Sequence, residues 1–311
     1  MENLKGYIKI ARPDHWIKQL FILPGMVFAV VAAKVQLGAS HIWPMVLTFF
    51  ATCCIASANY VINEWLDAKY DRFHPTKKNR PVVGGGLKFG WVMAEYAVLA
   101  ALGFVLALLV NFPVFLMCLW LFIMGILYNV RPFRTKDVPY LDVISESLNN
   151  AIRLMIGWFC ITASFLPPVS IVLGYWLGGA FLMAMKRFSE YRMIADKETA
   201  GLYRKSFRYY DDRKLLIFAF FCAMLSVFFC GIFMLKYRIE LLIAIPLICG
   251  LFCYYTSISY KEDSSAQKPE KLYREKGLMA YIFLLIGVVI VLCLVDIPAL
   301  QWFLSTIPIG L

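Results

Sequence analysis

Three oxygen-bearing side chains recur at four-residue intervals in one stretch of the chain: Asn63, Asp67 and Asp71. In a helix this spacing places them on a single face, with about 12 Å between the first and the last. Asn59 extends the same face by one turn. A carbonyl and two carboxylates are hard oxygen ligands, which suit a Mg²⁺ ion that keeps waters and binds substrate phosphates. The pattern predicts a magnesium site on Asn63, Asp67 and Asp71; a helix end with solvated charges is the alternative.

Cations and glycines follow this acidic face directly. Residues 72–86 read RFHPTKKNRPVVGGG and include Arg72, Lys77 and Arg80. Carboxylate-bound Mg²⁺ beside lysine and arginine is suited to a diphosphate, because the metal bridges its oxygens and the cations neutralise the remaining charge. We therefore expect Arg72, Lys77 and Arg80 to contact a diphosphate group.

A second polar stripe interrupts the apolar segment 140–165. It consists of Asp142, Glu146, Asn149, Asn150 and Arg153. Ionisable groups inside a bilayer are costly and usually face a bundle interior or a watery cavity. We expect this stripe to form the cavity wall opposite Asp67, with Asp142 or Glu146 as further metal ligands or as acceptors of substrate hydroxyls. A structural ion pair between Glu146 and Arg153 is the alternative.

The elements that carry these residues are membrane helices by composition. The 311 residues are 61% hydrophobic and 16% charged, whereas soluble domains have roughly a quarter of charged residues. Nine apolar runs reach the length of about 17–25 residues that crosses the hydrocarbon. They lie at 16–34, 41–66, 90–110, 112–130, 140–165, 168–187, 214–235, 239–260 and 277–298. The sequence predicts an all-α, polytopic membrane helical bundle of nine transmembrane helices, a single domain over residues 1–311, without a cleavable signal peptide.

The lysines and arginines are distributed unevenly between the two ends of these predicted helices. The N-terminal segment and the four longer connections hold 27 of the 31, and the opposite side holds three. Because positive residues stay inside, we expect a cytoplasmic N-terminus, a C-terminus outside, and a multi-pass protein of the cell (inner) membrane. The net charge of +11 favours anionic lipids or substrates, and no pattern points to nucleic acid. The nine cysteines lie in apolar runs and are interpreted as small hydrophobic residues.

These motifs resemble the UbiA superfamily of intramembrane prenyltransferases. The first match is Asn63-x-x-x-Asp67-x-x-x-Asp71 followed by Arg80-Pro81 and glycines. The second is residues 128–136, YNVRPFRTK, which are similar to the superfamily's Tyr-Ser-x-Pro-Pro-x-Arg-x-Lys loop. The resemblance covers essentially the whole chain and implies substrate-binding roles in this loop for Tyr128, Arg131, Arg134 and Lys136.

Three further segments resemble one branch, the decaprenyl-phosphate phosphoribosyltransferases. They are residues 12–19 (RPDHWIKQ), 74–81 (HPTKKNRP), and 186–190 (KRFSE) with 204–206 (RKS). Superfamily members that use prenyl diphosphates carry a second acidic motif, Asp-x-x-x-Asp, which residues 196–200 (DKETA) match poorly. Glu190 stands in its place, which favours a donor other than a prenyl diphosphate.

The resemblance implies a Mg²⁺-dependent transferase that moves a 5-phosphoribosyl group from phosphoribosyl diphosphate to a polyprenyl phosphate on the cytoplasmic side. We expect Lys186 and Arg187 at the 5-phosphate and Glu190 beside the ribose hydroxyls. The expected catalytic residues are Asp67, Asp71, Asp142, Glu146 and Glu190. The expected substrate-binding residues are Lys18, Asn59, Asn63, Arg72, Lys77, Arg80, Tyr128, Arg131, Arg134, Lys136, Asn150, Arg153, Lys186 and Arg187.

Two alternatives remain at this stage. One keeps the fold and the metal site but uses a prenyl diphosphate donor and an aromatic or lipid acceptor. The other is a transporter with the polar stripe along its pathway. The clustering of carboxylates near one membrane face disfavours the transporter, because translocation sites lie near the midplane.

Overall fold

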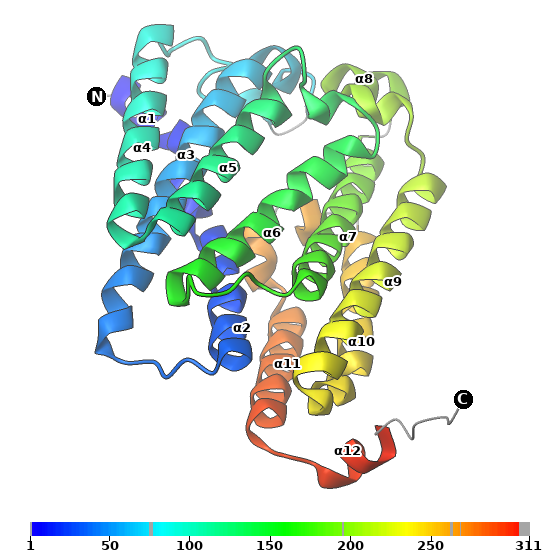
Figure 1. Cartoon of the computed structure of the whole chain (residues 1–311). Coiled ribbons are helices and arrows are strands. Elements are labelled where there is room, and N and C mark those ends of the chain that lie inside the picture. Colours follow the sequence, from blue (N-terminus) through cyan, green and yellow to red (C-terminus); the bar gives the residue numbers. More distant parts are fainter. Residues whose placement is uncertain (1, 75–76, 195, 262–263, 268, 305–311) are drawn as a thin grey trace.

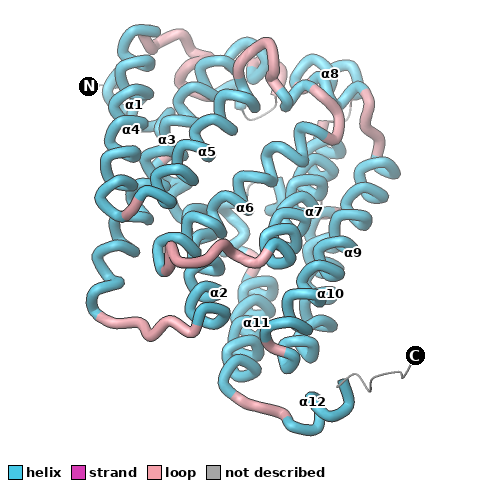
Figure 2. The backbone as a smooth tube through the Cα atoms, viewed as in Figure 1, coloured by secondary structure: helices cyan, strands magenta, loops and turns pink. Residues whose placement is uncertain are grey.

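The computed structural model describes residues 2–74, 77–194, 196–261, 264–267 and 269–304. Pro75 and Thr76 of the basic segment, and the C-terminus predicted to lie outside, fall beyond the described residues. Every regular element in this part of the chain is a helix, and the connecting loops gather at the two ends of the bundle (Figure 2). The N-terminus and the short helix α8 (Lys197–Tyr203) lie at one end, called the α8 end below, and α12 (Pro298–Leu304) lies at the other (Figure 1).

The body of the bundle, within the described residues, consists of the following helices. They are α2 (Leu23–Ala33), α3 (Ile42–Asp71), α4 (Phe89–Val110), α5 (Phe112–Asn129), α6 (Leu141–Ile161), α7 (Val169–Met193), α9 (Asp212–Tyr237), α10 (Ile245–Ser259) and α11 (Lys276–Leu294). The helix α1 (Glu2–Ala11) and 3₁₀ turns complete the described part. The turns are η1 (Pro13–Ile22), η2 (Ala39–His41), η3 (Lys77–Asn79), η4 (Thr135–Asp137), η5 (Lys205–Arg208), η6 (Ile239–Ala244), η7 (Ser265–Gln267) and η8 (Pro269–Arg274).

Eight helical segments of the described residues are long and apolar enough to cross a membrane. The predicted all-helical, multi-pass membrane protein is therefore confirmed. Helix α6 has 21 residues, but its polar stripe lowers its mean hydropathy, and it is not among the eight. The ninth span and the cytoplasmic side of the N-terminus stay predictions.

The first predicted span is longer than expected and is interrupted. The helical conformation begins at Glu2 instead of residue 16. It is interrupted between α1 and η1 at Arg12, whose φ of 51° lies in the left-handed region. Pro13 follows and has no N–H to continue a helical ladder. Because of this break, η1 approaches both α3 and α6.

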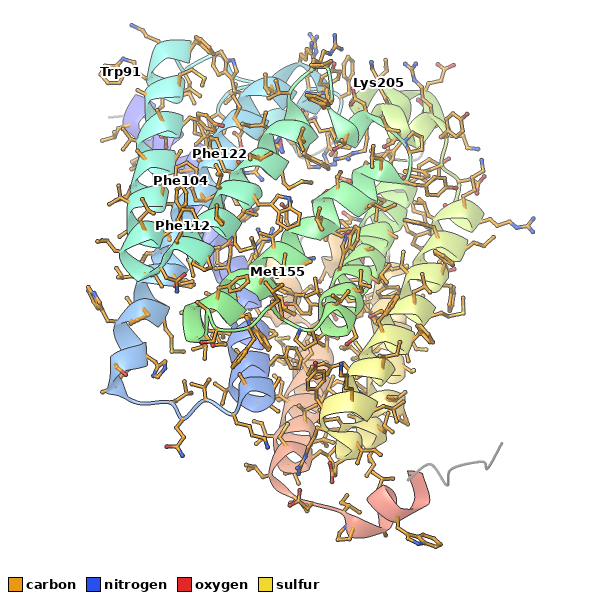
Figure 3. The ribbon with its side chains drawn as sticks, viewed as in Figure 1. Trp91, Phe104, Phe112, Phe122, Met155 and Lys205 are labelled. Atoms are coloured by element: carbon orange, nitrogen blue, oxygen red, sulfur yellow. The ribbon has the colours of Figure 1, made fainter. Side chains whose placement is uncertain are left out.

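Helix α6 runs obliquely between two groups of helices (Figure 1). On one side lie α3, α4 and α5, and on the other α7 packs along α9. Aromatic rings fill the first group: Phe104 of α4 and Phe122 of α5 meet edge to face at 5.4 Å between ring centroids (Figure 3). Trp91, at the outer surface of α4, is 67% exposed, as expected for a ring in contact with lipid. The stripe of α6 therefore lies between the two groups.

Two glycines allow α2 and α6 to cross at backbone contact. A Cβ atom on Gly25 would overlap with the carbonyl oxygen of Leu154, and a Cβ on Gly157 would overlap with that of Ile22. Small residues at such crossings are typical of membrane helices, where close packing replaces the hydrophobic effect as the driving force. The crossing fixes the distance between α6 and η1, which directly precedes α2 in the chain.

Replacing Gly157 should therefore destabilise the packing of α2 against α6. We expect Gly157→Ala to lower the free energy of unfolding by about 1–3 kcal/mol, because neither backbone can yield without moving a helix. Thermal unfolding in detergent measures the change. Gly287→Ala is the matched control, since a Cβ there meets nothing within 4 Å and alanine favours helix by about 0.5–1 kcal/mol. Equal losses in both variants would contradict the close-crossing argument.

Candidate active site

A cavity of about 490 Å³ lies between α3, α6 and α7. Asn59, Asn63, Asp67 and Asp71 of α3 line it, and so do Glu146, Asn149, Asn150 and Arg153 of α6. The two polar faces predicted to oppose each other therefore share one cavity. The other expected substrate-binding residues that line it are Lys18, Lys77, Arg80, Tyr128, Lys186 and Arg187.

Asp67 is held by two cations from the loop after α5. Its Oδ1 accepts hydrogen bonds from Lys136 Nζ at 2.5 Å and from Arg134 Nη2 at 2.9 Å. Lys136 also donates to Asn129 Oδ1 at 2.7 Å. Burial lowers the pKa of Lys136 to about 8, although Asp67 acts in the opposite direction. Arg134 and Lys136 do not line the main cavity and instead help to line a smaller pocket that shares Asp67 and Asp71 with it.

Asp71 belongs to a second network of charged side chains, which extends to Arg12 at the end of α1. Arg80 pairs with Asp71 and also approaches Glu64, with 3.9 Å between Nε and Oε2. Glu64 in turn accepts from Arg12 Nη2 at 3.0 Å. The sequence analysis assigned no role to Glu64 or Arg12, although Glu64 follows Asn63 directly and lies seven residues, about two turns, before Asp71. That spacing was the available signal.

The donor set fits a magnesium ion. Oδ2 of Asp67, Oδ1 of Asp71 and the side-chain carbonyl of Asn63 accept no hydrogen bond from the described residues, and all three residues line the cavity. Among the described residues, no group of three or more His, Cys, Asp and Glu side chains is arranged to hold a metal ion without the help of an amide. A Mg²⁺ ion here would complete its octahedron with water and substrate oxygens, which is its usual mode of binding in proteins.

Asp142 does not line the cavity, and its expected role as a metal ligand or hydroxyl acceptor stays a prediction. Its side chain is fully buried and accepts hydrogen bonds from Tyr210 at 2.6 Å and Ser206 at 3.1 Å. Arg187 and Arg204 approach the same carboxylate at 3.3 and 3.5 Å. Asp142 therefore ties α6 to the segment after α8.

Arg187 is also committed to protein contacts. It is 1% exposed and pairs with Asp142 at 3.3 Å, with Glu190 at 3.2 Å and with Glu146. It donates to Tyr128 Oη at 3.1 Å as well. Arg187 also lines the cavity, and its expected contact with a 5-phosphate stays a prediction.

Glu190 is likewise buried and paired with protein side chains. Its Oε1 accepts from Lys77 Nζ at 2.5 Å and from Tyr203 Oη at 3.0 Å, and His74 Nε2 lies at 3.4 Å. Burial lowers the pKa of Lys77, an effect that Glu190 opposes. Glu190 thus anchors the basic segment after α3 onto α7, and its expected position at ribose hydroxyls stays a prediction.

The remaining wall residues make specific contacts. Glu146 accepts from Tyr128 Oη at 2.7 Å and from Lys186 Nζ at 3.3 Å. Arg153 donates to Gln19 and Asn150, and no Glu146–Arg153 ion pair forms. Asn59 donates to the backbone carbonyl of Leu121 at 2.9 Å and packs on Gly125, so it joins α3 to α5.

Arg72 and Arg131, two further expected substrate-binding residues, also do not line the cavity. Arg72 is exposed at the end of α3 and donates to the carbonyl of Lys69 at 2.8 Å. Arg131 is also exposed. Arg204, which had no assigned role, lines the cavity and donates to Tyr128 Oη at 3.2 Å; its place in the 204–206 motif was the available signal.

Comparisons with known proteins agree with this geometry. The model of the UbiA prenyltransferase family matches residues 21–279. A structure of a UbiA homolog from Archaeoglobus fulgidus bound to GPP and Mg²⁺ has a TM-score of 0.68, with 22% identity over 91% of this chain and 99% of that chain. This likeness shows that the fold is shared.

Curated relatives include two phosphoribosyltransferases. The decaprenyl-phosphate phosphoribosyltransferase of Corynebacterium glutamicum is 28% identical over 229 residues, which are 68% of this chain and 61% of the relative. That of Mycolicibacterium smegmatis is 26% identical over 68% of this chain and 64% of the relative. The chain thus matches less than two thirds of their length. The protoheme IX farnesyltransferase of Bacillus mycoides is 30% identical over 47% of this chain and 48% of the relative.

Proposed function

Because the chain belongs to the UbiA prenyltransferase family, we propose that it is a Mg²⁺-dependent transferase that moves a 5-phosphoribosyl group from phosphoribosyl diphosphate to a polyprenyl phosphate. The similarity to two decaprenyl-phosphate phosphoribosyltransferases supports this choice. We further propose a single domain of nine transmembrane helices in the cell (inner) membrane, with the α8 end and the N-terminus in the cytoplasm.

The observation that carries the proposal is the charge of the cavity. Among the described residues, nine lysines and arginines line it against five carboxylates. A phosphoribosyl diphosphate and a lipid phosphate bring three phosphate groupings into one site, whereas a prenyl diphosphate with an aromatic acceptor brings one. Excess cations stabilise the more highly charged pair of substrates.

The donor diphosphate would lie on the acidic face of α3. Mg²⁺ held by Asn63, Asp67 and Asp71 would stabilise the negative charge of the departing diphosphate. Arg80, which is paired with Asp71, stands next to that position and would provide a cation for the phosphate oxygens.

The reaction needs no general base. An oxygen lone pair of the acceptor phosphate forms a bond to the anomeric carbon of the ribose, and the bond from that carbon to the diphosphate oxygen breaks with its electron pair. The acceptor oxygen is already anionic, so no proton is removed. The cavity accordingly needs cations at both ends of the reacting centre more than it needs a histidine.

The second candidate function is prenyl transfer from a prenyl diphosphate, as in other members of the family. Asp196, the first residue of the poorly matching second motif, is exposed and caps α8 by accepting from the backbone N–H groups of Glu198 and Thr199. It does not line the cavity, which favours the phosphoribosyl donor.

The decisive experiment offers the purified protein labelled phosphoribosyl diphosphate or labelled geranylgeranyl diphosphate. Each is supplied with polyprenyl phosphate and Mg²⁺, and the lipid is then extracted. Label in a lipid-linked ribose phosphate is the expected result. Reaction only with the prenyl donor and an aromatic acceptor would assign the protein to the second candidate, and release of no diphosphate from any donor would leave the transporter.

Lys186 remains a cation assigned to the 5-phosphate. It lines the cavity, and among the described residues it forms one ion pair, with Glu146 at 3.3 Å. A charge-assisted contact to a phosphate contributes about 1.5–3 kcal/mol, so we expect Lys186→Ala to raise the donor KM about tenfold or more. Lys78→Ala is the matched control, because Lys78 is exposed and does not line the cavity. A donor KM that changes equally in both variants would remove Lys186 from the site.

A further inference from the structure

The cavity extends beyond the metal-ligand face to Arg153, deep in α6. Arg153 follows Glu146 by seven residues, about 10 Å further along the helix axis. Its Nε donates to Gln19 Oε1 at 2.8 Å, and its Nη1 lies 3.4 Å from Asn150 Oδ1. No carboxylate of the described residues forms an ion pair with it. Every other arginine or lysine of α6 and α7 that lines the cavity has a carboxylate partner.

Neutral amides orient this guanidinium without compensating its charge. An arginine is always ionised, and a charge within a membrane bundle is costly unless it is paired or faces a watery cavity. Gln19 and Asn150 occupy one edge of the planar group, and Nη2 has no hydrogen bond to the described residues. The arrangement is that of a fixed cation with a free edge, which suits an oxyanion.

The cavity surface near the membrane interior is apolar. Phe21 of η1, Leu182 and Met183 of α7, and Tyr255 of α10 line the same cavity. Of these elements, η1 and α7 both contact α6. A ligand for this region therefore combines an anionic head with a long apolar body.

We propose that Arg153 binds the phosphate of the polyprenyl phosphate acceptor, with the first isoprene units along Phe21, Leu182 and Met183. This inference rests on the proposed function. Displacement at the anomeric carbon brings the acceptor oxygen in on the face opposite the leaving diphosphate. The metal ligands lie toward the α8 end of α3, whereas Arg153 lies deeper in the bundle, so the two phosphates stand on opposite sides of the ribose. Donor and acceptor thus depend on different cations.

The first test separates the two Michaelis constants. We expect Arg153→Gln to raise the KM for polyprenyl phosphate at least tenfold and to change the KM for phosphoribosyl diphosphate less than threefold. Lys186→Gln should show the reverse pattern. Arg153→Lys, which keeps the charge but loses the planar fork, should fall between Arg153→Gln and the wild type. An unchanged acceptor KM in Arg153→Gln, or equal increases in both constants, would overturn the proposal.

The second test does not depend on turnover. Labelled polyprenyl phosphate bound to the full-length protein in detergent is displaced with a short isoprenyl phosphate or with the corresponding alcohol. In the wild type the phosphate should compete at least tenfold better than the alcohol, and Arg153→Gln should abolish this difference. A preference that persists in both Arg153 variants overturns the inference. Failure of the wild type to transfer a phosphoribosyl group would instead refute the proposed function, and the displacement result would still stand.

Discussion

Asp67→Asn and Asp71→Asn should each lower turnover by about 10²–10⁴-fold, because a hard oxygen ligand of Mg²⁺ stabilises the leaving diphosphate by several kcal/mol. Asn63→Ala should have a smaller effect, since a neutral carbonyl contributes less to a divalent cation than a carboxylate does. Turnover at limiting and saturating Mg²⁺ measures both changes. Excess Mg²⁺ should restore part of the activity of Asn63→Ala and little of the activity of the two aspartate variants.

Asp137→Asn is the matched control for these two aspartates. Asp137 pairs with the same Arg134 that holds Asp67, at 3.2 Å, but it does not line the main cavity. Asp67→Asn and Asp137→Asn therefore both remove a negative charge near Arg134, but only Asp67→Asn would also remove a metal ligand. Comparable activity of all three variants at limiting Mg²⁺ would remove the metal site from α3.

The second large effect concerns folding. We expect Arg187→Ala to destabilise the protein by about 3–5 kcal/mol or more, because removal of one member of a buried ion cluster leaves uncompensated charge. Arg187 faces Asp142, Glu146 and Glu190 and is 1% exposed. Yield of monodisperse protein and the thermal midpoint in detergent measure the loss.

Arg192→Ala provides the comparison for that variant. Arg192 lies on the same helix, its side chain is 41% exposed, and its one ion pair, with Asp212, spans 3.9 Å. Exposed pairs contribute about 0–1 kcal/mol, so this variant should fold normally. If Arg187→Ala folds as well as Arg192→Ala and only its donor KM rises, then Arg187 binds phosphate, as the sequence analysis expected.

The spacing of residues along single helices could be predicted from the sequence. A repeat of four places Asn63, Asp67 and Asp71 on one face of a helix. The free-energy cost of polar groups in contact with lipid predicted that the stripe of α6 faces the interior of the bundle. Both faces line the one cavity. The all-helical architecture could be predicted from composition. Long apolar runs cross a bilayer as helices, because a helix satisfies all its backbone hydrogen bonds within one segment.

The partners of each charge could not be predicted in this way. Arg187 meets Asp142 from 45 residues away, and Lys77 meets Tyr203 from 126 residues away. Spacing along the sequence gives no information about such pairs, so the ion pairs of Arg187 and Glu190 with other helices were not expected. The break at Arg12 and Pro13 was readable in principle, since proline interrupts a helical ladder.

The position of the cavity between two hydrophobic clusters has a consequence for the thermodynamics of the whole protein. One cluster surrounds α7 and α9, the other surrounds α2, α3 and α5, and α6 contributes to both. Many of the side chains that line the cavity between them are polar. A ligand that bridges α3 and α7 links the two halves, and at a hundred times its dissociation constant it adds about 2.7 kcal/mol to their joint stability. The melting temperature should therefore rise with ligand concentration and report the occupancy of the site.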